Sequence, residues 1–240
     1  DHRNDDSEIE DIVYAYAFLC KENSQVTLKE KQNFILANVV LNCINPKSTE
    51  LHHFEELRIQ LLSVLNTVEL EPNSYCVEPF FLASLLFWPE NTKQLNEDSK
   101  KMEHYLIRLS ESFRKLYGTV HHSKQPLAHF YLAKGSGLNR FVHKRKIDQL
   151  FSSLPEQKLN SLWQKGNIWK EKAVRDLLLP LDGKAEGTTI YVNYGSNEPF
   201  KIPVQPALSC LLKNGPNIQR VSFYLGFSIA GLLAYNIQSL

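Results

Sequence analysis

The chain has 240 residues, 43% of them hydrophobic, and its 27 Lys and Arg residues nearly balance 26 Asp and Glu residues, for a formal net charge of +1. This length and apolar content predict one large or two small folded domains and exclude a disordered chain. The near-zero net charge argues against a protein that coats nucleic acid with its whole surface.

The positive charge is concentrated in the middle of the chain. Residues 1–120 carry 12 basic and 19 acidic side chains, residues 121–175 carry 11 and 3, and residues 176–240 carry 4 and 4. The middle segment therefore has a net charge of +8. If an anionic partner binds this chain, we expect it to bind there.

The cysteines and the start of the chain indicate the type of protein. The four cysteines, Cys20, Cys43, Cys76 and Cys210, are far apart, and the first two lie in apolar helical patterns, as is typical of an intracellular protein. No segment reaches the roughly 18 apolar residues that a membrane-spanning helix needs. The chain begins without Met or a signal-peptide core, so we expect it to be a piece of a longer protein.

The first half has the pattern of a helical protein. Apolar residues at helical spacing predict helices over about 6–22, from Thr27 to Asn45, from Ser48 to the "EPNS" break, from Pro79, and over about 97–117. Helix pairs thus begin about every 45 residues, which is near the length of helical-repeat units. We therefore expect repeat-like packing of helices in residues 1–155.

The last part has the pattern of a small β-rich domain. The stretches "TTIYVNYG", "EPFKIPVQ" and "QRVSFYLGFSIAG" alternate with period two between Gly, Asn and Pro turns. In the last stretch Val221, Phe223, Leu225 and Phe227 share one face, so we expect one buried face. A small barrel hides the edges of so few strands best. The predicted fold class is therefore α+β, with a helical domain over 1–155 and an OB-like β-barrel over 156–240.

The candidate site is the stretch "HFYLAKGSGLNRFVHKRKIDQLF", residues 129–151. Its "AKGSG" part lacks the upstream Gly and the Lys-Ser/Thr ending of a P-loop, which argues against a nucleotide triphosphate site. A Gly-rich turn that leads into a solvated helix is one interpretation. The other is a nucleic-acid surface that neutralises several phosphates, formed by Lys134, Arg140, His143, Lys144, Arg145, Lys146 and Lys170.

Aromatic residues alternate with these cations. They could serve as stacking platforms for unpaired bases, or they could be core residues, which is the more frequent role. The residues concerned are Phe130, Tyr131, Phe141, Trp163 and Trp169.

The motifs of metal and catalytic sites are missing from the sequence. No Cys-x-x-Cys or His-x-x-x-His spacing is present, and neither is a Gly-x-Ser-x-Gly elbow. We therefore expect a chain without a metal site, a cofactor or a catalytic centre.

Several stretches resemble the carboxy-terminal end of the sterile alpha motif domain-containing protein 9 family: "FYLAKGSGLNRFVHK", "LWQKGNIW", "LLLPLDGKAEG", "YVNYG", "IPVQPA" and "RVSFYLGFSIAGLLAYNI". Ala133 stands where the family is expected to have glycine. The resemblance implies a tetratricopeptide-like helical region before the barrel. It also implies a cytoplasmic, interferon-induced antiviral and antiproliferative protein that represses translation, whose nuclease and ATPase regions lie outside these residues.

Two functional hypotheses remain open. The first is a regulatory module that binds RNA, either single-stranded or transfer RNA, through the cations listed above. The second is a protein-interaction and autoinhibition module, in which the same cations meet an acidic surface of other domains or of another copy. Self-association of the full-length protein is compatible with both hypotheses.

Overall fold

The computed structural model describes residues 51–70, 76–89, 97–118, 129–132, 137–194, 200–207 and 219–240, together with Asn33, Leu36 and Gly135. The predicted helices over 6–22 and from Thr27 to Asn45 lie outside the described residues, apart from the helical Asn33 and Leu36.

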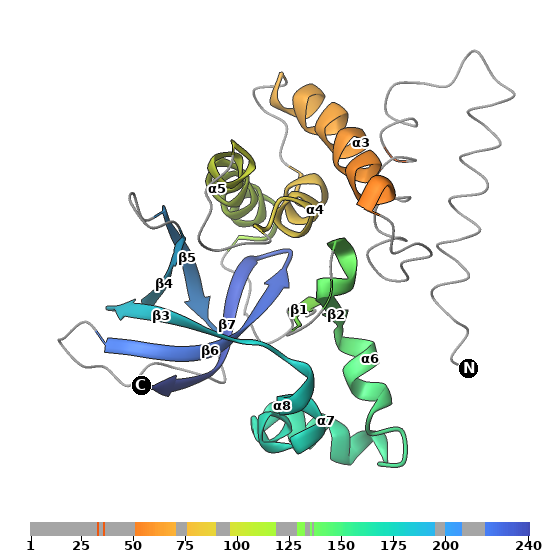
Figure 1. Ribbon diagram of the computed structural model, residues 1–240, viewed down its shortest axis with the longest axis vertical. Helices are drawn as coiled ribbons and strands as arrows, with labels where there is room; N and C mark the ends of the chain where they lie inside the picture. Colours follow the sequence, from red (N-terminus) through yellow and green to blue (C-terminus); the bar gives the residue numbers. More distant parts are fainter. Residues whose placement is uncertain are drawn as a thin grey trace, which may run out of the picture.

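Three helices form the described part of the first half: α3 (Leu51–Glu69), α4 (Glu78–Leu86) and α5 (Glu97–Tyr117) (Figure 1). The helices predicted from Ser48, from Pro79 and over 97–117 are confirmed. Residues Pro79 to Leu86 of α4 are all buried, because this helix is the centre of the helical core. The three helices have 19, 9 and 21 residues and do not confirm a tetratricopeptide-like repeat.

Five strands form a closed barrel: β3 (Pro180–Glu186), β4 (Thr189–Tyr194), β5 (Phe200–Pro206), β6 (Gln219–Ser228) and β7 (Gly231–Ser239). Their order around the barrel is β3-β4-β5-β7-β6, and β6 pairs with β3 to close it. Only the pairing of β5 with β7 is parallel. This arrangement of a small Greek-key barrel is consistent with the expected OB-like barrel.

The strand β6 is buried on both faces, which differs from the expected single buried face. Phe223 and Leu225 point into the barrel, as the alternation predicted. Tyr224, on the opposite face, is also buried, because it packs against Trp169 at 5.8 Å between ring centroids. Next to it, a Cβ atom at Gly226 would lie 2.6 Å from the ring of Tyr235, so only glycine fits there.

A second hydrophobic core lies beside the barrel. It is formed between the barrel and the segment that connects the helical half to β3. That segment contains η2 (Gly137–Arg140), α6 (Lys144–Gln149), α7 (Glu156–Gln164), η3 (Asn167–Lys170) and α8 (Lys172–Leu177). Ile147, Ile168 and Val174 from these elements are buried against Phe130 and Tyr235. Trp169 of η3 packs on Tyr224 of β6 and Tyr235 of β7, with ring centroids 5.8 and 5.4 Å apart, so this segment covers part of the outer face of both strands. Figure 1 shows α7 and α8 below the barrel.

The helical half and the barrel share one hydrophobic core. The strand β1 (His129–Tyr131) pairs with both β2 (Phe141–His143) and β6, so it extends the sheet of the barrel. Trp88, at the end of α4, places its ring edge-on to Phe227 of β6 at 5.2 Å. The boundary between residues 155 and 156 stays a prediction. However, β1 and β2, which precede it, are joined to the barrel by backbone hydrogen bonds.

The buried position of Tyr224 predicts a loss of stability at alkaline pH. Burial raises the pKa of Tyr224, and the nearby Arg175 acts in the opposite direction. The unfolded chain releases this proton near pH 10, whereas the folded protein keeps it to a higher pH. Stability is therefore fully present below about pH 10 and falls as pH rises toward the folded pKa. Urea unfolding on either side of pH 10 should show a smaller alkaline loss in Tyr224→Phe than in the wild type; an equal loss would contradict this.

Candidate nucleic-acid interface

The basic segment, which comprises residues 137–177, connects the helical half and β1 to the first strand of the barrel. It follows β1 and runs through η2, β2, α6, α7, η3 and α8 before it enters the barrel at β3. In Figure 1, α6, α7 and α8 lie in the lower part of the molecule, whereas β2 lies at mid-height beside β1. The side chains of the predicted site therefore lie in three different environments.

Arg140 is buried, with 3% of its surface exposed. Its Nη2 donates hydrogen bonds to the carbonyl oxygens of Leu85, at 3.4 Å, and of Trp88. The guanidinium also lies over the rings of Phe141, at 5.0 Å, and Phe54, at 5.8 Å. Because Arg140 is enclosed by α3, α4 and β2, it cannot contact a phosphate in this fold, and the prediction of an exposed Arg140 is wrong.

Lys144 is held in a local ion pair. Its Nζ lies 2.6 Å from Asp148 Oδ2, one helical turn further along α6, and 4.6 Å from the centroid of the Trp163 ring. The other carboxylate oxygen of Asp148 accepts a hydrogen bond of 2.8 Å from Trp163 Nε1. Lys144 therefore fastens α6 to α7, and its charge is largely compensated by Asp148.

His143 is half-buried and caps the start of α6. Its Nδ1 accepts a hydrogen bond of 3.2 Å from the backbone N–H of Arg145. Its ring lies edge-on to His129 of β1, with the centroids 5.2 Å apart. The position of His143 is therefore explained by helix capping and by packing across the β1–β2 pair.

The remaining described cations of the predicted site are exposed. Arg145 and Lys146 lie on α6, and Lys170 ends η3, where its Nζ donates to Asn167 Oδ1 at 3.0 Å. Lys134 lies outside the described residues. Four further exposed cations on the same helical segment were not included in the predicted site: Lys158, Lys165, Lys172 and Arg175.

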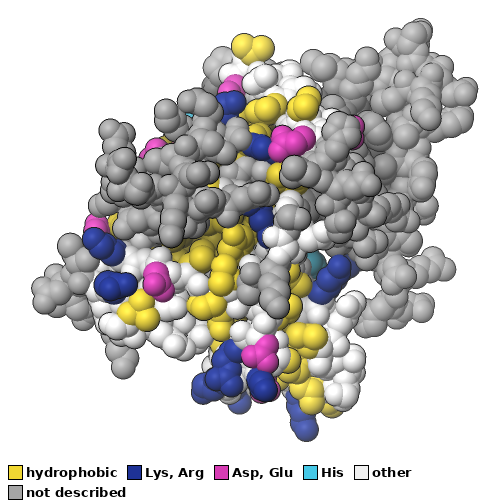
Figure 2. All heavy atoms as spheres, in the orientation of Figure 1, with side chains coloured by type: hydrophobic (Ala, Val, Ile, Leu, Met, Phe, Trp, Pro, Cys, Tyr) yellow, Lys and Arg dark blue, Asp and Glu magenta, His cyan; other side chains and the backbone are white. Residues whose placement is uncertain are grey.

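We call the seven exposed cations of this segment the basic surface: Arg145, Lys146, Lys158, Lys165, Lys170, Lys172 and Arg175. Figure 2 shows dark-blue side chains gathered along the lower edge of the molecule, where Figure 1 places α7 and α8. Only three acidic residues accompany them between 145 and 178 once the paired Asp148 is set aside: Glu156, Glu171 and Asp176.

Most aromatic residues of the segment are core residues. Phe130, Phe141 and Trp169 are buried. Trp163 is half-buried, and its ring is stacked on Phe130 at 6.2 Å and edge-on to Trp169 at 5.3 Å. The interpretation as core residues therefore holds for Phe130, Phe141 and Trp169, whereas Tyr131 and Trp163 are half-buried at its edge.

Metal and membrane sites do not appear in the described ranges. No group of three or more His, Cys, Asp or Glu side chains could hold a metal ion there. None of the helices in that part of the chain is both long and apolar enough to cross a bilayer.

The chain thus forms an OB-like barrel with a basic helical segment packed on its outer face. Comparison with known proteins then gives the family. The chain is 49% identical over 95% of its length to sterile alpha motif domain-containing protein 9 of Homo sapiens. It is 49% identical over 98% to the human 9-like protein, and 47% identical over 96% to the mouse 9-like protein.

The chain is therefore a homologue of the carboxy-terminal part of the sterile alpha motif domain-containing protein 9 and 9-like proteins, which confirms the resemblance. It spans only about 14% of the length of the human relatives. No family model and no solved structure matches it.

Proposed function

We propose that this chain is a non-catalytic regulatory module that binds nucleic acid through the basic surface. Seven exposed Lys and Arg side chains within about 30 residues, against three acidic ones, are the observation that supports this function. Each cation that neutralises a phosphate releases condensed counterions, which drives binding. The ligand is RNA, either single-stranded or transfer RNA.

The resemblance gives this module its setting. We propose that it lies at the carboxy-terminal end of a cytoplasmic, interferon-induced antiviral and antiproliferative protein that represses translation. The enzymatic regions of that protein lie outside this chain, and the module regulates them by responding to bound RNA. The full-length protein also associates with itself in this proposal.

The contacts in this proposal are made to phosphates more than to bases. The rings of Phe130, Phe141 and Trp169 are enclosed in the core, and the ring of Trp163 packs on its aromatic neighbours. Cations without accessible rings position a backbone but read little sequence. Binding should therefore depend strongly on salt and weakly on sequence.

Charge reversal on α6 tests this function. Arg145→Glu combined with Lys146→Glu should weaken binding of a fluorescently labelled single-stranded RNA, and of transfer RNA, by roughly tenfold or more, because two phosphate contacts become repulsive. Fluorescence anisotropy measures the affinities. The matched control is Lys101→Glu with Arg220→Glu, which makes the same charge change at exposed residues outside the basic surface.

The two outcomes are distinct. If the α6 variant binds as tightly as the wild type, the basic surface is not the binding site. If the wild-type chain binds neither RNA at low salt, nucleic-acid binding itself is rejected.

The second candidate function is a protein-interaction and autoinhibition module without nucleic-acid binding. It is favoured by Arg140, because a cation of the basic segment already joins the two halves through the carbonyl oxygens of Leu85 in α4 and of Trp88, just after α4. In this case the basic surface docks on acidic residues of other domains or of another copy. A pull-down of the remaining domains by this chain, measured with and without RNA, separates the candidates. RNA that displaces the partner shows that both bind the basic surface. RNA that leaves the pull-down unchanged is the result expected of a module without nucleic-acid binding.

A further inference from the structure

A pocket of about 370 Å³ lies between α5 and the barrel. It shares no lining residue with the basic segment, and its walls come from α5, β5 and the β6–β7 hairpin. The helix α5 contributes Glu103, Leu106, Ile107, Ser110, Glu111 and Arg114; β5 contributes Pro203 and Gln205; and the β6–β7 hairpin contributes Ala230 of the turn and Gly231 and Leu232 of β7. The volume is at the lower end of the range for ligand sites, so it accommodates a few side chains.

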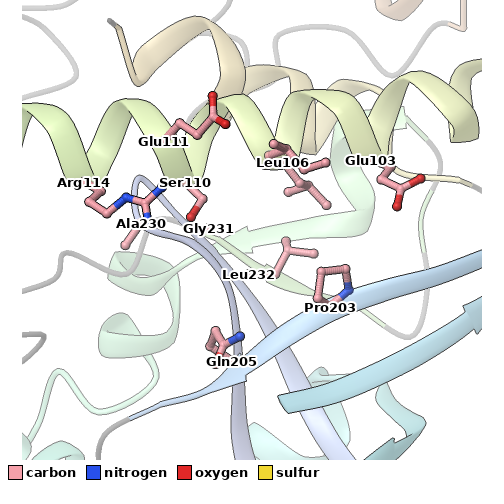
Figure 3. A pocket seen from close by; sticks show the side chains of 11 residues that line it. Glu103, Leu106, Ser110, Glu111, Arg114, Pro203, Gln205, Ala230, Gly231 and Leu232 are labelled. Carbon is pink, nitrogen blue, oxygen red and sulfur yellow. The ribbon is translucent and has the colours of Figure 1, made fainter. Parts of the chain in front are cut away.

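The pocket has charged groups of opposite sign at its two ends. Figure 3 shows Arg114 and Ser110 together at one end, above the β6–β7 turn, and Glu103 at the other end, above Pro203. Neither Arg114 nor Glu103 forms an ion pair with another described residue. Glu111 instead points away from the barrel in Figure 3 and pairs with Arg108 at 3.4 Å.

The middle of the pocket is apolar. Leu106 and Leu232 face each other across it in Figure 3. Ile107 is 52% exposed at its rim, and Pro203 is also exposed. Exposed apolar side chains around a concave site are typical of a surface that receives a partner.

The floor of the pocket is fixed before any ligand arrives. Ser228 Oγ donates a hydrogen bond of 3.0 Å to the carbonyl oxygen of Gly231 and accepts one of 3.2 Å from the N–H of Ala230. These bonds hold the β6–β7 turn in one conformation. A preformed floor lowers the entropy lost on binding.

The charge of the pocket is unsuited to nucleic acid. A strand of RNA carries a negative charge at every nucleotide, and Glu103 would repel it at one end of the pocket. The ligand that fits has one anionic group, an apolar middle and one cationic group. Such a pattern is easily provided by a protein segment.

We propose that this pocket binds an extended peptide segment that has an apolar side chain between an acidic and a basic one. The acidic side chain contacts Arg114 and the basic one contacts Glu103, and the peptide can run in either chain direction. Glu103 and Arg114 are eleven positions apart on α5, which is about 16 Å along a helix. An extended peptide rises about 3.3 Å per residue and points alternate side chains to the same face. The span corresponds to about five residues, and the nearest shorter separation that keeps both charged side chains on one face is four residues, about 13 Å. We therefore place the acidic and basic side chains four residues apart, with the apolar one midway, and the long side chains of Glu103 and Arg114 reach across the remaining distance.

The probe is the blocked peptide acetyl-Asp-Ser-Leu-Ser-Lys-amide, titrated into the complete 15N-labelled chain. Saturable shifts should appear in the NMR signals of the Ser110, Gly231 and Leu232 amides at millimolar peptide. Arg114→Glu should reverse the preference by about tenfold toward a peptide with Lys at both ends, because it exchanges a charge-assisted contact for a repulsive one. Glu103→Lys should favour a peptide with Asp at both ends.

The control is Lys101→Glu, which makes the same change of charge on α5 outside the pocket and should keep the wild-type preference. The proposal is overturned if the Asp–Lys peptide gives no saturable shift at these amides, or if the variants rank the three peptides as the wild type does. Shifts of the same amides by oligouridylate would also overturn it, since they would show a nucleic-acid site. None of these results depends on whether the basic surface binds RNA.

Discussion

Arg140→Glu should prevent stable folding of the chain. The substitution places a carboxylate against the carbonyl oxygens of Leu85 and Trp88, which now accept hydrogen bonds from the guanidinium. Leaving a buried charge without its partner costs about 3–5 kcal/mol, a large part of the roughly 5–15 kcal/mol that stabilises a typical domain. Urea unfolding followed by circular dichroism should show a lost or strongly shifted transition.

Two further variants make this test specific. Lys146→Glu makes a similar change of charge at an exposed residue in the same segment and should alter the free energy of unfolding by no more than about 0.5 kcal/mol. Arg140→Lys keeps the charge but not the planar fork of donors, so its stability should be intermediate. If Arg140→Glu unfolds at the wild-type urea concentration, Arg140 is not the buried contact described here.

Trp88→Ala should weaken the junction between the helical half and the barrel. Trp88 is 2% exposed and contacts Phe227 of β6 and Tyr131 of β1, at 5.2 and 6.3 Å between ring centroids. Removing a buried aromatic side chain costs about 3–5 kcal/mol. Thermal unfolding should shift to a lower midpoint, and amide hydrogen exchange should increase in both α4 and β6.

Two further variants accompany Trp88→Ala: a control with a small expected effect and a conservative substitution that should restore part of the stability. Leu150→Ala removes a side chain that is 49% exposed, so its effect should be small. Trp88→Phe should recover part of the loss because an aromatic ring still meets Phe227. Faster exchange in α4 alone, with β6 unchanged, would contradict a shared core.

The barrel was predictable because its signal is local. Period-two alternation around Phe223 and Leu225 marks the inward face of β6 without any knowledge of its neighbours. Burial of the other face was not predictable from the strand. Tyr224 and Gly226 look like residues of a solvent-facing side, and Trp169, which covers Tyr224, lies 55 positions earlier in the chain.

The site was predictable only in part, because some of its contacts join residues that are far apart in the sequence. The Lys144–Asp148 pair has helical i, i+4 spacing and could be found in the sequence. Arg140 lies in a run of cations that suggests solvent, yet its partners Leu85 and Trp88 are more than 50 residues earlier. Lys158, Lys165 and Lys172 were not included because they follow the dense run of cations at 144–146, but the structure shows that all three are exposed on the segment that contains α7 and α8.

The salt dependence of RNA affinity is the most direct measure of whether the basic surface acts on phosphates. On single-stranded RNA, the logarithm of the association constant should fall linearly with the logarithm of salt concentration, with a slope of about −0.7 for each phosphate neutralised. The Arg145→Glu, Lys146→Glu variant should give a shallower slope than the wild type. An affinity that stays constant as salt increases, or a slope that the variant leaves unchanged, would contradict the account.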